Sequence, residues 1–181
     1  DPAAIMDQAE GDIFAINASN IKEGFLPIKR ILSDTFKLIE SYQKGEVIGV
    51  PTGLRDLDTL TSGFQKTDLI ILAGRPGMGK TAVALTMLAN AAIDYRRTVA
   101  FFSLEMGREQ LVQRILCSQA KVNMHLLRTG KLSPRDFPKL SLAVGPISEA
   151  KIFIDDHPSL NILELRAKCR RLKAQHGLDL V

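Results

Sequence analysis

Cysteine is scarce in this sequence, with two residues, Cys117 and Cys169, among 181. They lie 52 positions apart without the spacing of metal ligands, which argues against a disulfide framework or a zinc site. No apolar run reaches the length of a membrane span, and the start, Asp1 to Ala4, lacks the basic and apolar character of a secretion signal. These absences favour a cytosolic protein with no membrane contact, in which both cysteines are small buried residues.

Neither sign of charge is in large excess. Lys and Arg total 24 against 20 Asp and Glu, giving a net charge of +4, which permits an anionic partner without requiring one. The apolar fraction of 45% is enough for the core of one domain with an appendage. Because the sequence has no initiator methionine and stops abruptly at Leu178 to Val181, we expect a piece of a longer protein.

The most informative stretch is a glycine-rich loop that fits the phosphate-binding pattern G-x-x-x-x-G-K-[ST] at every fixed position. The apolar run before it, 69–73, is typical of a strand buried on both faces, and 81–93 after it is predicted to be a helix. Such a loop wraps a nucleoside triphosphate and Mg²⁺, with the Lys80 ammonium on the β- and γ-phosphates and the Thr81 hydroxyl on the metal. The predicted nucleotide contacts are Gly74, Arg75, Pro76, Gly77, Met78, Gly79, Lys80, Thr81 and Ala82.

Strands and helices alternate along the rest of the chain. This order predicts an α/β fold with a parallel sheet and helices on both faces. We expect strands at 98–103, at 151–154 and from 178, and helices at 54–60, at 108–120, from the Ser133-Pro134 cap, and at 161–175.

The N-terminal part has a different pattern. A helix is predicted over 2–17, and a clearly amphipathic one from Pro27 to Lys44. We therefore divide the chain into a helical linker, 1–45, and a nucleotide-binding part, 46–181. The pattern leaves open whether the amphipathic helix packs on its own domain or on a neighbouring subunit. Its apolar stripe comprises Ile28, Ile31, Leu32, Thr35, Ile39 and Tyr42.

Glu105 is the best candidate for a catalytic carboxylate. It follows the strand at 98–103, which we predict to lie beside the strand of the phosphate loop, and ligands of open α/β sheets bind at the carboxyl ends of strands. There it could orient and deprotonate an attacking water molecule. The alternative is a surface glutamate at the start of a helix.

Asp155 and Asp156 form a second acidic candidate. A magnesium-contacting carboxylate often follows an apolar strand, and 152–155 fits that pattern, but the pattern is not specific. We favour turn formation or helix capping before Pro158.

Arg166, Arg170 and Lys173 recur on one face of the last predicted helix. A nucleic-acid track is possible, but the outer face of a helix that covers a sheet is usually charged, so we favour a solvated face.

Several stretches resemble a known family. Pro51-Thr52-Gly53 with Leu57-Asp58 and Ser62-Gly63, ahead of the phosphate loop, is similar to RecA-type ATPase cores. Phe101-Phe102-Ser103-Leu104-Glu105-Met106, together with Ile154-Asp155-Asp156-x-Pro158 and Leu165 to Lys173, resembles the bacterial replicative DNA helicases of the DnaB type. The likeness covers nearly the whole chain, with 7–44 similar to that family's linker. Gly107 departs from the Ser that is common there, which affects the helix cap rather than the chemistry.

The resemblance implies a RecA-like P-loop ATPase. It implies an ATP- and Mg²⁺-dependent homo-hexameric ring that moves along single-stranded DNA at the bacterial replication fork, with a primase and a helicase loader as partners. Glu105 would be the catalytic base, Lys80 and Thr81 the phosphate and magnesium contacts, and helix 27–44 would dock on the next subunit. The second magnesium-site Asp, the DNA-contacting loops and the arginine finger would follow Val181, so this piece should not unwind DNA alone.

Two other functions remain open. A recombination ATPase of the RecA or RadA kind would share the phosphate loop, although the Ser-Leu-Glu-Met run argues against it. A non-catalytic fragment for oligomerisation and loader docking would fit the amphipathic helix and the missing catalytic parts.

Overall fold

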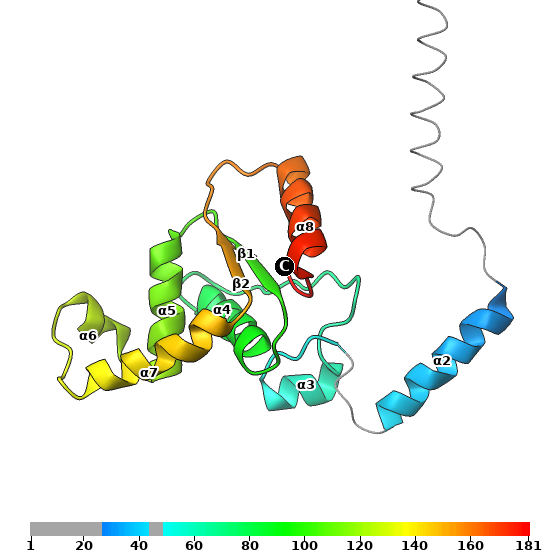
Figure 1. Cartoon of the computed structure of the whole chain (residues 1–181), viewed down its shortest axis with the longest axis horizontal. Coiled ribbons are helices and arrows are strands. Elements are labelled where there is room, and N and C mark those ends of the chain that lie inside the picture. The colour runs from blue at the N-terminus through cyan, green and yellow to red at the C-terminus, as the bar shows by residue number, and fades with distance from the viewer. Residues whose placement is uncertain (1–26, 44–48) are drawn as a thin grey trace, which may run out of the picture. The chain divides into compact units, whose positions relative to one another are not determined.

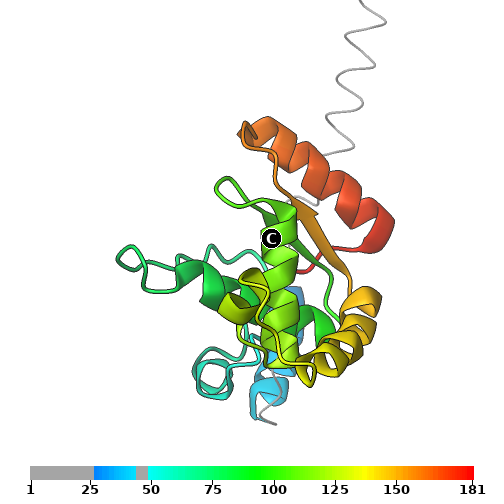
Figure 2. The same cartoon turned by 90° about the vertical axis from the view of Figure 1, so that its left-hand side faces the viewer.

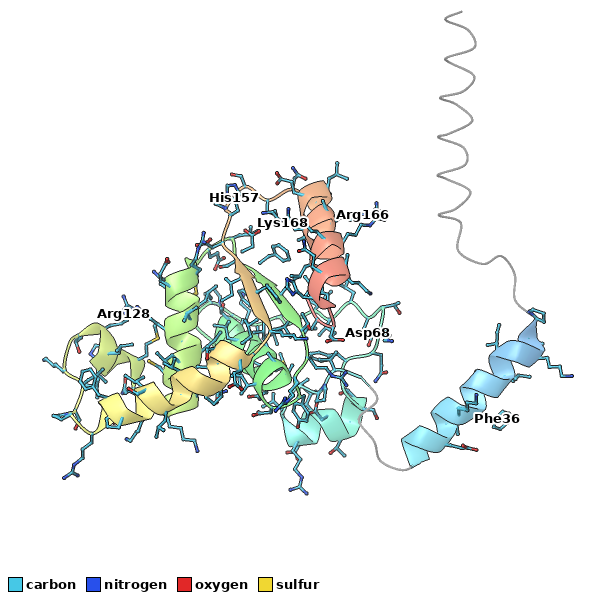
Figure 3. All side chains as sticks on the ribbon, in the orientation of Figure 1. Phe36, Asp68, Arg128, His157, Arg166 and Lys168 are labelled. Carbon is cyan, nitrogen blue, oxygen red and sulfur yellow. The ribbon has the colours of Figure 1, made fainter. Side chains whose placement is uncertain are left out.

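The computed structural model describes residues 27–43 and 49–181. The chain divides into two units, 1–44 and 45–181, which are considered separately. In the first unit, helix α2 (Ile28–Gln43) confirms the predicted amphipathic helix, whereas the helix predicted at 2–17 lies outside the described residues. Large apolar side chains of α2 are open to solvent within its unit, among them Phe36 at 63% exposure (Figure 3).

The second unit contains the remaining helices and strands (Figure 1). Helix α8 starts where predicted because Asn161 and Glu164 form a reciprocal capping box. Helix α7 begins at Asp136 rather than at Ser133, since the Ser133 hydroxyl oxygen accepts a hydrogen bond from the Arg135 N–H in a preceding turn. The elements are α3 (Arg55–Thr61), α4 (Lys80–Ile93), β1 (Val99–Phe102), α5 (Arg108–Ala120), α6 (Met124–Arg128), α7 (Asp136–Glu149), β2 (Ile152–Asp155) and α8 (Ile162–His176).

Strands β1 and β2 pair in parallel, from Val99 opposite Ile152 to Phe102 opposite Asp155. Successive side chains of a strand point to opposite faces of the sheet. Val99 and Phe101 therefore pack toward α4 and α5, while Phe153 contacts His176 of α8 with ring centroids 5.0 Å apart. Figures 1 and 2 show α8 on one side of the strands and α4 and α5 on the other, which confirms the predicted α/β class.

The core lies between the sheet and helices α4 and α5. Small residues on α4 let the helix approach the strands closely, because Ala91 and Ala92 are buried against Val99. A second cluster joins α4 to α5 through Leu85 and Leu111. Among the described helices, none combines the length and the apolarity that crossing a membrane requires.

The apolar run at 69–73 was predicted as a strand beside β1, and this prediction is wrong. In the described part of the chain the run forms no ladder, and its exposed fractions alternate from Leu69 to Leu72 as 87, 44, 80 and 45%. Both edges of β1 are already used: the Val99 N–H donates to the Lys151 carbonyl oxygen at 2.9 Å, and the Ala100 N–H donates to the Leu180 carbonyl oxygen at 2.9 Å. The segment beginning at Leu178, and not 69–73, is therefore the neighbour of β1.

A buried carboxylate holds the chain where it approaches α4. Asp58, 8% exposed, accepts hydrogen bonds from the Thr52 N–H at 2.8 Å, the Thr52 hydroxyl at 2.7 Å and the Gly53 N–H at 2.9 Å. The Asn90 side-chain amide of α4 donates to the Thr52 carbonyl oxygen at 3.0 Å. Gly53 has φ +72, and a Cβ there would lie 2.5 Å from the Asn90 amide nitrogen. The Pro51-Thr52-Gly53 motif with Leu57-Asp58 therefore has a structural role: its hydrogen bonds connect α3 to α4 through Thr52.

We expect Asp58→Ala to lower the free energy of unfolding by about 2–4 kcal/mol, because several buried donors lose a charged acceptor. Asp56→Ala, a matched removal of an exposed carboxylate from the same helix, should change it by about 0.5 kcal/mol or less. Chemical denaturation monitored by circular dichroism measures both. Equal stabilities of the two variants would contradict the role of the Asp58 network.

Candidate phosphate-binding site

The phosphate loop leads directly into α4, whose N-cap is Gly79. Gly77 and Gly79 have φ of +79 and +86, a left-handed backbone that favours glycine at both positions. The first helical hydrogen bond joins the Val83 N–H to the Gly79 carbonyl oxygen, and no side chain caps the helix. The N–H groups of Lys80, Thr81 and Ala82 therefore have no acceptor within the helix and lie at its positive pole.

The side chains of the loop leave this helix start open. A Cβ at Gly74 would lie 3.3 Å from Cγ of Lys80, so the missing side chain leaves room for the lysine stem. Within the described residues Lys80 forms no salt bridge, and the loop is exposed apart from a half-buried Thr81. Unpaired N–H donors, an ammonium group and a hydroxyl at one helix start suit a bound polyphosphate with a divalent cation.

Glu105 lies in the turn between β1 and α5. The turn starts at Ser103, whose N–H donates to the Asp155 carbonyl oxygen at 2.8 Å and whose hydroxyl oxygen accepts the Met106 N–H at 3.1 Å. The Glu105 side chain is exposed, and no hydrogen bond or salt bridge links it to Lys80 in the part of the chain that is described. The structure thus holds the candidate base and the phosphate loop on separate turns.

The two acidic residues at the end of β2 point to opposite sides of the sheet. Asp155 pairs with Lys168 of α8 at 2.5 Å and accepts the His157 N–H at 3.0 Å; Figure 3 shows Lys168 on the helix and His157 on the loop. Asp156 pairs with the Arg108 guanidinium of α5 at 2.7 Å. Hydrogen bonds from Lys168 and Arg108 hold the pKa of each carboxyl below its usual value.

The bond from the His157 N–H to Asp155 is the kind of turn expected before Pro158, whereas Asp156 caps a different helix, α5. Across residues 27–43 and 49–181, no group of three or more potential metal ligands is found. Cys117 is buried and Cys169 half-buried, and burial raises the pKa of both thiols, as expected for packing residues rather than reactive ones.

The basic face of α8 is solvated. Arg166, Arg170 and Lys173 are exposed, whereas Lys168 and Leu172 of the same helix are half-buried. Figure 3 shows Arg166 directed away from the strands. Because exposed basic side chains fit a solvated face and a nucleic-acid track equally, the solvated-face interpretation stays a prediction.

Comparison with known proteins identifies the family. The sequence matches the family described as DnaB-like helicase C terminal domain over residues 49–181. The chain belongs to this family. It is 46% identical to the replicative DNA helicase DnaB of Geobacillus stearothermophilus and 45% identical to the replicative DNA helicase DnaC of Bacillus subtilis, in each case over 98% of this chain and 39% of the relative. The chain therefore spans about two fifths of these relatives.

Solved structures share the fold. One of them, an ATPase domain, superposes with a TM-score of 0.81 at 31% identity, covering 87% of this chain and 56% of that one. A DnaB-like replicative helicase, studied with its interactions with primase, superposes with a TM-score of 0.76 at 30% identity, covering 96% of this chain and 42% of the other. The predicted RecA-like fold class is confirmed by these neighbours.

Sequence reasoning missed the link between Arg108 and Asp156, 48 positions apart. The departure at Gly107 was a usable signal, because a helix that starts without a polar cap needs an acceptor from elsewhere. The motif that ends at Asp58 was recognised in the sequence, but the hydrogen bonds of its buried carboxylate to Thr52 and Gly53 were not predicted.

Proposed function

We propose that this chain is part of the ATP-hydrolysing motor of a bacterial replicative DNA helicase. The observation that carries the proposal is the open start of α4, where the complete phosphate-binding pattern includes positive-φ glycines and leads into N–H groups that have no acceptor within the helix. Membership of the DnaB-like helicase family favours this function over a recombination ATPase.

The chemistry we assign to the loop is phosphate binding. The N–H groups of Lys80, Thr81 and Ala82 donate to phosphate oxygens, and the Lys80 ammonium offsets negative charge on the β- and γ-phosphates. The Thr81 hydroxyl would hold Mg²⁺, and the bound ion would supply positive charge against the phosphates. The other contacts come from the backbone of Gly74, Arg75, Pro76, Gly77, Met78 and Gly79.

Glu105 is proposed as the general base. Its carboxylate would accept a proton from the water molecule that attacks the terminal phosphoryl group. Two features support this role: the side chain is exposed at the carboxyl end of β1, and it has no competing ion pair among the described residues.

The assembly we propose is a homo-hexameric ring around single-stranded DNA. The apolar stripe of α2 supports docking on the next subunit, since Ile28, Ile31 and Leu32 are 73, 48 and 48% exposed within their own unit. A primase is the proposed partner because one structural neighbour was studied with its interactions with primase. We also propose a helicase loader as a partner, and the cytoplasmic replication fork as the place where the protein acts.

Lys80→Ala in the full-length protein should abolish ATP hydrolysis and DNA unwinding, because the β- and γ-phosphates lose the lysine ammonium group that offsets their charge. Lys66→Ala, which removes another exposed lysine ahead of the loop, should leave both activities near wild type. Phosphate release and strand-displacement assays measure the effect. Unwinding retained by Lys80→Ala would rule out this loop as the motor site.

Glu105→Gln should slow ATP hydrolysis by about 10²–10⁴-fold, the usual contribution of a general base. Binding of a fluorescent nucleotide should be largely preserved, because the phosphate loop is unchanged. Glu109→Gln, at the next acidic residue and also exposed, is the control and should turn over normally. Equal turnover in the two variants would remove Glu105 from the reaction.

Replacing Ile31 and Leu32 of α2 with Glu should weaken the hexamer, because charge would be buried in the docked stripe. The control is Lys29→Ala with Lys37→Ala, which lowers the net charge of the helix by the same amount without changing the apolar stripe. This variant should leave assembly intact. Sedimentation velocity measures the oligomer. A ring that survives the first pair of substitutions would reject docking through this stripe.

A further inference from the structure

Helix α5 begins without a cap of its own. Its N-cap is Gly107, with φ −67 and ψ 153 and no side chain to accept a hydrogen bond. Asp156, from the loop after β2, provides the missing acceptor: its Oδ2 accepts the Arg108 N–H at 3.0 Å, while its Oδ1 contacts the Arg108 guanidinium at 2.7 Å. One carboxylate from the loop after β2 thus fixes the first residue of α5.

The turn that carries Glu105 is consequently held at both ends. At its start, the Ser103 N–H donates to the backbone carbonyl oxygen of Asp155, an acceptor that a side-chain substitution retains, and the Ser103 hydroxyl oxygen accepts the Met106 N–H. At its end, Asp156 holds Arg108. The position of the exposed Glu105 side chain depends on these two anchors, since it forms no hydrogen bond or ion pair of its own with the described residues.

We infer that Asp156 is a positioning residue for Glu105: it caps α5 from outside and thereby fixes the turn from which the carboxylate reaches the reacting water. The inference rests on the proposed function, because it concerns the placement of the proposed base. Catalysis by a positioned group is sensitive to small displacements, so a loosened turn lowers turnover without changing the phosphate loop that binds nucleotide.

The neighbouring carboxylate provides a matched control. Asp155 is adjacent in sequence and also forms an ion pair, but its partner is Lys168 of α8, on the other face of the sheet. Removing Asp155 breaks a comparable ion pair and leaves the Arg108 cap in place. A general loss of stability affects both variants, whereas loss of positioning affects only Asp156.

The test uses the full-length protein with Asp156→Ala, Asp156→Asn and Asp155→Ala. We expect Asp156→Ala to lower kcat for ATP hydrolysis by about 10- to 100-fold with KM nearly unchanged. Asp156→Asn, which keeps an acceptor for the Arg108 N–H, should recover part of this loss, and Asp155→Ala should turn over like wild type. Hydrogen exchange of the peptide spanning 103–109 should accelerate in Asp156→Ala alone.

A second-site variant tests the cap directly. Gly107→Ser adds a hydroxyl that can accept hydrogen bonds from the first turn of α5. A Cβ at this position meets only ordinary contacts, 3.6 Å from Glu109 Oε2 and 3.9 Å from Asp156 Oδ2. Gly107→Ser should therefore restore part of the kcat that Asp156→Ala loses.

Two results would overturn the inference: an unchanged kcat in Asp156→Ala, whether or not exchange is faster, or an equal loss of kcat in Asp155→Ala. Normal hydrolysis by Glu105→Gln is a different failure, because it rejects the proposed base without any change at Asp156.

Discussion

The in-register parallel pairing of β1 with β2 is the constraint on which the candidate site depends. Because the two strands end together at Phe102 and Asp155, the turn after β1 and the loop after β2 leave the sheet at the same edge. Strand alternation then directs Asp155 toward α8 and the next residue, Asp156, toward α5. A single ladder therefore both presents Glu105 and brings an acceptor to the helix that follows it.

The same ladder decides where the phosphate loop can join the sheet. Lys151 lies against one edge of β1 and Leu180 against the other, so β1 has no free edge near Val99. The apolar run at 69–73 can enter the sheet only beyond one of these neighbours. Its alternating exposure is what an extended segment shows when one face is half covered and the other open. The turn that carries Glu105 and the phosphate loop therefore do not follow adjacent strands.

Sequence reasoning succeeded where the cause is local. The capping box of Asn161 and Glu164 fixes the start of α8, and the glycines of the phosphate loop permit the left-handed backbone found at Gly77 and Gly79. It failed where the cause is a partner distant in sequence. An apolar run such as 69–73 predicts burial but not which strand provides it, and the ion pair between Arg108 and Asp156 joins residues that no periodicity connects.

The two helices that follow the candidate turns start in contrasting ways. Both α4 and α5 have a glycine N-cap that forms no side-chain cap. At α5, Gly107 has an ordinary φ and a carboxylate from the loop after β2 fills the helix start. At α4, Gly79 has a φ of +86 that favours glycine, and the described residues provide no side chain that caps the helix. The first N–H groups of an exposed helix have no acceptor within the helix, so this start, to which the described residues supply no side-chain cap, is suited to an anion from solution. The contrast is between a helix start whose first N–H is paired within the protein and one whose first N–H groups have no acceptor in the helix.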